Sequence, residues 1–375
     1  MPSAHVPTAN INALYQNTTA GVTANPAVVD AAVADIVSTI NQNADYVNSL
    51  VTSGTLSPIP PDFLYRQALI NGNFDVWQRG TSFTSSGYTA DRWVIADDGG
   101  TPSYTVTQES FTPGQTAVPG EPRYFTKISV SATSVGAIVF GQRIEDVRTF
   151  AGQKATLSFY ARADVPTTGS QVTSAMFQVF GTGGSEQVGV LEYPIALTTS
   201  WQRYSFTFNI PSIAGKIIGQ GSYLYVHPLR INPSAPLTNY YIAQVQLNAG
   251  DVALPFQPRS FAEELALCQR YYEKSYDIGD SPGAVNNFRG AEAYPTYQSG
   301  GTNRRVASFK VNKRVTPTIT VYSPFTGAAN KIFRTSSDID ALIAEIGQSS
   351  FTLYPAASYV AGDDIRFHWT ADAEL

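Results

Sequence analysis

Apolar positions follow a seven-residue repeat near the start of the chain. Between residues 26 and 54, apolar residues and one asparagine are spaced 4, 3, 4, 3, 4 and 3 residues apart. This spacing predicts a helix with a heptad seam of alternating a and d positions. The seam consists of Val29, Val33, Ile36, Ile40, Asn43, Val47 and Leu50.

The residues of this seam favour a homotrimer. Isoleucine occupies both a d position, Ile36, and an a position, Ile40, which favours three or four strands over two. Asn43 is polar and would fix the register and the oligomeric state. We therefore predict a trimeric coiled-coil helix over residues 26–54. The alternative is an amphipathic helix that packs on its own domain.

Two further segments flank this helix. Residues 1–25 are polar and have no hydrophobic period, so we predict an arm that is either ordered on contact with another protein or simply disordered. Residues 55–66 contain Pro58, Pro60 and Pro61, and we interpret them as a semi-rigid, extended linker.

The hydrophobic period changes to two in the next part of the chain, residues 67–258. From Gln202 to Ile210, every second residue is aromatic or aliphatic and the residues between are polar. The same alternation recurs over 124–130, 155–163 and 241–247, with turns rich in Gly, Pro, Ser and Thr between the runs. Many short alternating strands predict an antiparallel β-sandwich, a jelly roll of eight or more strands.

Residues 259–276 contain a helix signal. Ser260 precedes Glu263 by three residues, which is the spacing of a capping box. We predict a helix that links two β domains, with one apolar face. That face is predicted to carry Phe261, Leu265, Cys268 and Tyr272.

The remaining residues, 277–375, return to strand periods. Alternation over 307–311 and 365–371 predicts strands, and a short window at 336–346 has helical spacing. We predict a smaller C-terminal β domain that forms a tip. The fold class is therefore mainly β, with an N-terminal coiled coil, a jelly roll, a linking helix and this tip.

The composition excludes several classes of protein. A net charge of −5 and a pI near 5.3 argue against nucleic-acid binding. The single cysteine excludes an intrachain disulfide framework. No run approaches ~18 apolar residues, so we expect no membrane insertion. The first residues lack a signal-peptide pattern, and we expect synthesis in a cytoplasm without standard secretion.

The sequence holds no recognisable catalytic or metal motif. His5, His227 and His368 lie far apart, and neither a nucleophile elbow nor a P-loop occurs. Acidic residues such as Asp97 and Asp98 cannot be paired across a site from sequence alone. We predict no catalytic residue, no metal and no cofactor, and we expect passive binding. A calcium site is an alternative, with oxygen ligands from Asn71 or Asp75 and from Asp251.

A carbohydrate site is a different possibility, because sugars need aromatic faces and polar groups. Trp77 and Trp93 each have an arginine and an aspartate nearby in the sequence. We propose Trp77, Arg79, Asp91 and Trp93 as candidate carbohydrate-binding residues. A buried structural corner explains the same residues equally well.

Several of these runs resemble known families. Residues 69–80, followed by 90–93, resemble the opening of tail-fibre and receptor-binding proteins of tailed bacteriophages. Residues 256–276 are similar to the helix that closes that module, and 367–375 to its last strand. Segments at 156–163 and 199–204 resemble carbohydrate-binding modules of the galactose-binding-like jelly-roll type.

This resemblance implies a function in a virion. It implies a homotrimeric tail fibre, assembled in the host bacterial cytoplasm and attached to the tail or baseplate through residues 1–25. Its β domains would adhere to a glycan or protein on the host surface. Two alternatives remain: a depolymerase that degrades the glycan, and a purely structural adaptor or spacer.

Overall fold

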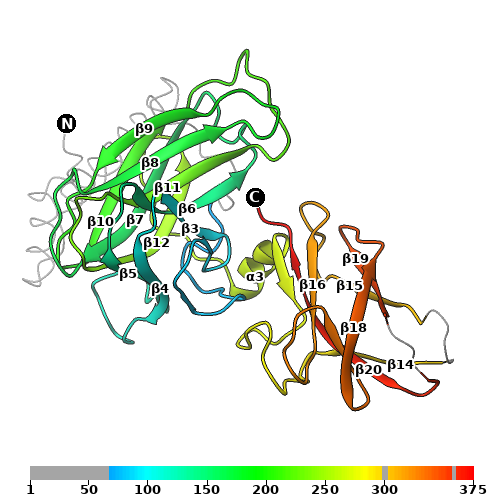
Figure 1. The fold of residues 1–375 in the computed structure, drawn as a ribbon. Helices are drawn as coiled ribbons and strands as arrows, with labels where there is room; N and C mark the ends of the chain where they lie inside the picture. The colour runs from blue at the N-terminus through cyan, green and yellow to red at the C-terminus, as the bar shows by residue number, and fades with distance from the viewer. Residues whose placement is uncertain (1–66, 298–302, 357–359) are drawn as a thin grey trace, which may run out of the picture. The chain divides into compact units, whose positions relative to one another are not determined.

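The computed structural model describes residues 67–297, 303–356 and 360–375 (Figure 1). Contacts divide the chain into two compact units, Met1–Tyr65 and Arg66–Leu375, and everything below concerns the second unit. Among the described residues, no helix is both long enough and apolar enough to cross a bilayer.

Three predictions lie outside the described residues. They are the arm at 1–25, the linker at 55–66, and the coiled coil at 26–54 with its seam from Val29 to Leu50. The trimer inferred from that seam stays a prediction.

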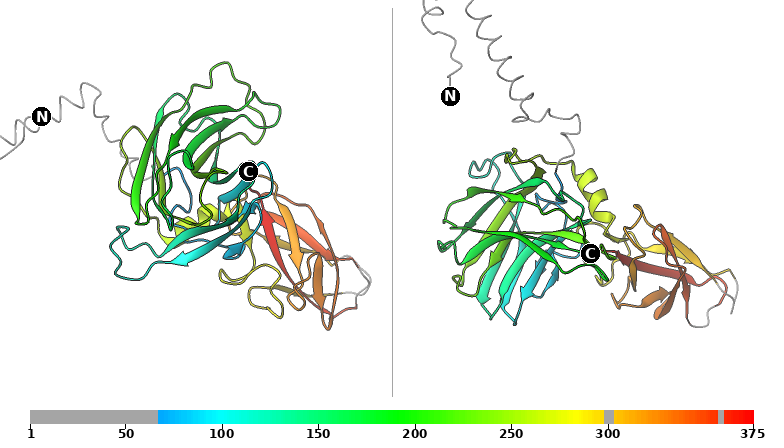
Figure 2. Two further views of the ribbon diagram at one scale, coloured as in Figure 1. Left: turned by 60° about the vertical axis from the view of Figure 1, so that its left-hand side comes forward. Right: turned by 90° about the horizontal axis from the view of Figure 1, so that it is seen from above.

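The first half of the described chain forms two six-stranded antiparallel sheets (Figure 2). We call the first the β12 sheet, and its order is β1-β4-β5-β12-β7-β10. Its strands are β1 (Ser82–Phe83), β4 (Ser103–Ser110), β5 (Tyr124–Ala132), β12 (Asn239–Ala249), β7 (Lys154–Ala163) and β10 (Gln202–Asn209).

The second sheet, which we call the β11 sheet, has the order β2-β3-β6-β11-β8-β9. The chain passes repeatedly from one sheet to the other, as it does in a jelly roll. The strands of this sheet are β2 (Gly87–Tyr88), β3 (Trp93–Asp98), β6 (Ala137–Glu145), β11 (Tyr223–Ile231), β8 (Val172–Val179) and β9 (Val188–Pro194).

The hydrophobic core of the sandwich follows from the period of two. Leu157 and Phe159 of β7 and Leu224 and Val226 of β11 all point into one shared cluster and are fully buried. Burying each such side chain contributes about 1.5–3 kcal/mol. The predicted antiparallel β architecture is confirmed for the described residues.

The helix in the described part of the chain, α3, spans Phe261–Gln269. The Ser260 hydroxyl accepts a hydrogen bond from the Glu263 amide at 3.3 Å, which confirms the predicted N-terminal cap. The predicted apolar face is correct for Cys268, which is buried, but wrong for Phe261, which is 49% exposed while Glu264 is buried. Tyr272 is not helical but begins β13.

The C-terminal part folds around β20, the last strand. β20 pairs with β13, β14, β16 and β17, and Phe351, Phe367 and Trp369 lie in the core of this part. The strands are β13 (Tyr272–Lys274), β14 (Glu292–Pro295), β15 (Arg305–Ser308), β16 (Thr318–Tyr322), β17 (Lys331–Arg334), β18 (Ser337–Ala344), β19 (Ser350–Pro355) and β20 (Asp364–Asp372).

The helical window predicted at 336–346 is wrong. These residues form β18, which pairs with β17 on one side and β19 on the other. Thr335 has a φ of 47° at the turn between β17 and β18. Residues 337–340 pair with β17 and residues 341–344 pair with β19, and this pairing overrides the local helical spacing.

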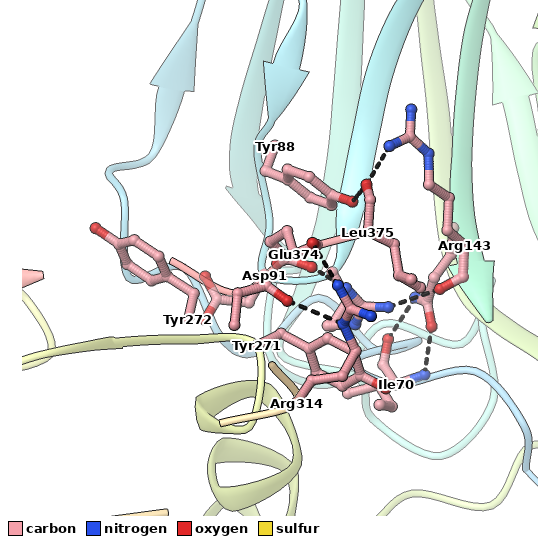
Figure 3. A network of polar contacts seen from close by, with 12 residues as sticks. Ile70, Tyr88, Asp91, Arg143, Tyr271, Tyr272, Arg314, Glu374 and Leu375 are labelled. Carbon is pink, nitrogen blue, oxygen red and sulfur yellow. Dashed lines mark hydrogen bonds and ion pairs between the residues drawn. The ribbon is translucent and has the colours of Figure 1, made fainter. Parts of the chain in front are cut away.

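The end of β20 and the residues after it bind to the sandwich through arginines (Figure 3). Arg92 forms a buried ion pair with Glu374, and Arg314 donates to the Glu374 carbonyl at 2.9 Å. The Leu375 carbonyl accepts a hydrogen bond from the Tyr88 hydroxyl at 3.0 Å. We call these contacts the junction network. It comprises Arg79, Tyr88, Asp91, Arg92, Arg143, Arg314, Asp372, Glu374 and Leu375.

Candidate functional site

The two tryptophans predicted to bind sugar are buried. Trp93 is 0% exposed, stacks on Phe140 with ring centroids 5.2 Å apart, and donates its indole N–H to the Asn71 carbonyl at 2.9 Å. Trp77 is 4% exposed and donates its indole N–H to the Phe74 carbonyl at 2.8 Å. A stacking platform needs an open ring face, and Trp93 has none.

The two charged members of that set serve the junction network. Buried Asp91 accepts hydrogen bonds from the amide of Gln78 at 2.9 Å and from its side chain at 2.5 Å. Arg79 lies 3.6 Å above the ring of Tyr272 and forms an ion pair with Asp372 at 3.1 Å. Burial raises the pKa of Asp91, and the charge of Arg79 opposes that shift. These four residues therefore form a structural corner.

A more open arrangement lies on the outer face of the β11 sheet. Along β11, Leu224 and Val226 point into the core, whereas Tyr225 and His227 lie on the opposite face. The register of β11 shifts between Val226 and Leu229 against β6, around Pro228. Proline cannot donate to the ladder, and such a bulge re-aims the neighbouring side chains.

A glycine on β6 makes room for these rings. A Cβ on Gly141 would lie 3.0 Å from Cε2 of Tyr225 and 3.0 Å from Cδ2 of His227. It would also lie 2.6 Å from the Val226 carbonyl oxygen. Only glycine allows the two rings to lie this close to the β6 backbone.

The rings border a cavity of about 250 Å³, which we call the β11 trough. The His227 ring lies edge-on to Tyr225, with centroids 3.9 Å apart, and 5.2 Å from the ring of Phe177. β3, β6, β8 and β11 all contribute side chains. The lining residues are Ala96, Asp97, Asp98, Val139, Phe177, Gln187, Tyr225, His227 and Arg230.

His227 is the most informative residue of the trough. It is 5% exposed, and neither ring nitrogen has a hydrogen-bond partner among the described residues. Burial, with the charges of Arg230 and Arg143, lowers the pKa of His227 to about 3. The imidazole is therefore neutral at pH 7 and offers one donor and one acceptor. A buried polar group without a partner costs about 1–3 kcal/mol, which a bound ligand or ordered water would offset.

Arg230 is held rigidly at one end of the trough. Its guanidinium donates to Asp98 at 2.7 Å, to Glu192 at 3.3 Å and to Asn232 at 3.0 Å. Two carboxylates thus surround one cation, and the local charge does not attract an anion. This end of the trough presents fixed polar groups to a neutral molecule.

The trough suits noncovalent recognition. It combines ring faces with a donor and an acceptor whose positions are set by the sheet. Within the described ranges, no group of three or more His, Cys, Asp or Glu side chains could hold a metal ion. Burial raises the pKa of the Cys268 thiol well above its usual range, so this cysteine is not an activated nucleophile.

The sequence contained a signal for this face. From Tyr223 to Val226, aromatic and aliphatic residues alternate, and His227 follows. One polar-aromatic face opposite an aliphatic face is typical of a strand with a functional outer surface. The bulge at Pro228 and the ring of Phe177, which comes from β8, are not visible in that local pattern.

Comparisons with known proteins do not assign a family. No family model matches the chain, and no curated protein is similar to it. Solved structures that align with it include the enzymatically active domain of bacteriophage CBA120 tailspike protein 4 (17% identity, TM-score 0.31, 50% of this chain and 22% of that one). A putative sugar-binding protein from Bacteroides thetaiotaomicron aligns with 14% identity, a TM-score of 0.34, 49% of this chain and 100% of that one.

A third alignment is with the family 11 carbohydrate-binding module from Clostridium thermocellum, in complex with a β-1,3-1,4-mixed-linked tetrasaccharide. Identity is 10% and the TM-score is 0.29, over 47% of this chain and 99% of that one. The chain spans only about a fifth of the tailspike domain. At these scores, the alignments carry no argument about ligand or activity.

Proposed function

We propose that this protein is an adhesin whose β11 trough binds a neutral glycan. The observation that carries this proposal is His227, a buried neutral imidazole with two unpartnered nitrogens in an aromatic-lined cavity. A sugar ring supplies what this cavity lacks. Its hydroxyls both donate and accept, and its C–H faces pack against aromatic rings.

The geometry suggests how such a sugar is held. One sugar hydroxyl bonds to one ring nitrogen of His227. Because the two nitrogens point away from each other, a water or a distant second hydroxyl bonds to the other. Phe177 and Tyr225 contact the apolar face of the ring. Asp98 and Arg230, which already bond to each other, orient a further hydroxyl without a conformational change.

The role in a virion is the finer part of the proposal. It rests on the resemblance of residues 69–80 and 256–276 to phage tail-fibre proteins and on the predicted trimer. In this account the protein adheres passively and does not cleave its ligand. Three copies on one fibre would raise avidity without any new contact.

The test is an array of bacterial surface polysaccharides, probed with the full chain and two variants. Phe177→Ala removes one wall of the trough, and Trp201→Ala is the matched control. Trp201 is a partly exposed aromatic residue that packs on Phe111 and Phe125 at 5.4 and 5.5 Å, away from the trough. We expect Phe177→Ala to lose at least about tenfold in affinity, and Trp201→Ala to bind as the unchanged protein does.

Three outcomes would contradict the proposal. Equal losses in both variants would remove the trough from glycan binding. If size-exclusion chromatography shows that a polysaccharide becomes shorter during incubation, the depolymerase is favoured. Binding to tail components but to no glycan would favour the structural adaptor.

A further inference from the structure

A second cavity, of about 290 Å³, lies beside the first turn of α3. It shares no lining residue with the β11 trough. We call it the α3 cavity. The side chains that matter below are Asp75, Trp77, Gln108, Arg123, Tyr124 and Phe261.

Its walls are aromatic. The indole N–H of Trp77 is already bonded to the Phe74 carbonyl, so its edge offers the cavity an apolar surface. Phe261 is 49% exposed, although Ser260 caps α3 beside it and the helix does not need that ring for packing. An exposed aromatic at the mouth of a cavity is typical of a binding surface.

The polar groups of the α3 cavity are unevenly satisfied. Lys274 is occupied, because its ammonium donates to the carbonyls of Ile278 and Asp280 at 2.9 and 2.6 Å. Arg123 is exposed, and its guanidinium makes no hydrogen bond or ion pair with any described residue. It lies 4.9 Å from the ring of Tyr124, which leaves its planar edge free.

The hydrogen-bond acceptors of the α3 cavity are Asp75 and Gln108. Asp75 accepts one hydrogen bond, from the Asn73 side chain at 3.0 Å. Burial raises the pKa of Asp75, while Asn73 and the charge of Arg123 favour its ionised form. The Gln108 amide nitrogen donates to the Phe74 carbonyl at 3.2 Å, which leaves its oxygen for a donor in the cavity.

We infer that the α3 cavity binds a sugar residue that carries a carboxylate, such as a hexuronate or a nonulosonate. Arg123 binds the carboxylate with two parallel hydrogen bonds, which lysine cannot do. Asp75 and Gln108 accept hydrogen bonds from ring hydroxyls, and Tyr124 and the exposed ring of Phe261 contact the C–H face. This site is independent of the neutral-glycan site in the trough.

The experiment titrates the full chain with D-glucuronate, N-acetylneuraminate and the neutral analogue D-glucuronamide, by calorimetry or saturation-transfer NMR. We expect one acid to bind at millimolar concentration, and the amide at least about tenfold more weakly. The acid that binds identifies the class of sugar. Arg123→Gln should abolish the preference for the acid over the amide. Arg123→Lys should keep only part of that preference.

The control is Arg148→Gln, which removes an exposed arginine paired only with Asp146. It should leave acid binding unchanged, as should Phe177→Ala in the trough. The inference is overturned if neither acid binds, if acid and amide bind equally, or if Arg123→Gln binds the acid as before. Because Phe177→Ala tests the trough alone, failure of one site is distinguishable from failure of the other.

Discussion

The structural corner and the β11 trough contain the same kinds of residue but differ in how their polar atoms are satisfied. In the corner, both indole N–H groups and both Asp91 oxygens bond to protein groups at 2.5–2.9 Å. The unpartnered buried atoms there are Arg79 Nη1, which lies 3.9 Å from Asp91, and Gln78 Oε1. In the trough, both nitrogens of His227 and one oxygen of Asp97 have no partner within the described chain.

A side chain with no partner at all, as His227 is, distinguishes the two regions better than residue type does. Tryptophan, arginine and aspartate near one another are expected both in a sugar site and in a buried corner. A folded protein normally pairs its buried polar groups, so an unpaired group costs stability unless a ligand completes it. The predictions below test this distinction.

The largest effect should come from the corner. Trp93→Ala removes a fully buried indole that packs on Phe74 and Phe140, with its ring centroid 5.2 Å from each of theirs. We expect a loss of about 3–5 kcal/mol in the free energy of unfolding, measured by urea denaturation. If the Trp93→Ala variant kept normal stability but lost glycan binding, Trp93 would instead be a binding residue.

Next comes the junction network. Glu374→Ala leaves Arg92 buried without its carboxylate, and such a change costs about 3–5 kcal/mol. Glu345→Ala is the control, because its ion pair with Arg304 is exposed and should cost at most about 1 kcal/mol. Similar small losses of unfolding free energy in both variants would mean that the network does not stabilise the fold.

A smaller loss should follow from filling the floor of the trough. Gly141→Ala places a methyl group against Val226, Tyr225 and His227, and overpacking typically costs about 1–3 kcal/mol. Gly279→Ala, where no atom lies within 4 Å of the new Cβ, should change the melting temperature little. If the two variants melt together, the rings do not depend on this glycine.

The last prediction is a pH dependence of stability, measured between pH 7 and pH 5. The pKa of His227 is about 3 in the folded protein, against 6.5 for an ordinary histidine. Below about pH 6.5 the unfolded chain binds a proton that the folded chain does not, so this group lowers stability as pH falls. The loss is at most about 1.4 kcal/mol per pH unit, continuing to about pH 3. Urea unfolding of His227→Phe at pH 7 and pH 5 should therefore show a smaller decrease than the unchanged protein, and parallel decreases would contradict the assignment.

Local sequence pattern predicted much of the fold. Alternation from Gln202 to Ile210 corresponds to β10, and Ser260 caps α3 as its spacing to Glu263 indicated. The helix predicted at 336–346 is wrong because helical spacing does not show strand pairing. Ile339 pairs with β17, and Leu342 and Ile343 pair with β19. Strand pairing is a long-range contact that a local period does not contain.

The candidate sites were less predictable for the same reason. His227, Phe177 and Asp98 are brought together by the order β3-β6-β11-β8, and none is near another in sequence. The four residues named from sequence do meet, but as a closed corner. Whether polar atoms are satisfied depends on the whole fold, and composition does not reveal it.

The most direct test of the trough is His227→Phe, with stability and glycan affinity measured on the same sample. Phenylalanine keeps a buried aromatic ring, slightly larger than imidazole, and removes the two unpartnered nitrogens. We expect the free energy of unfolding to change by less than about 1.5 kcal/mol, because losing an unsatisfied buried group offsets the tighter packing of the larger ring. Affinity for the glycan identified on the array should fall at least about tenfold. Unchanged affinity would contradict the account, whatever the stability, because His227 would then be a structural residue of the β11 sheet.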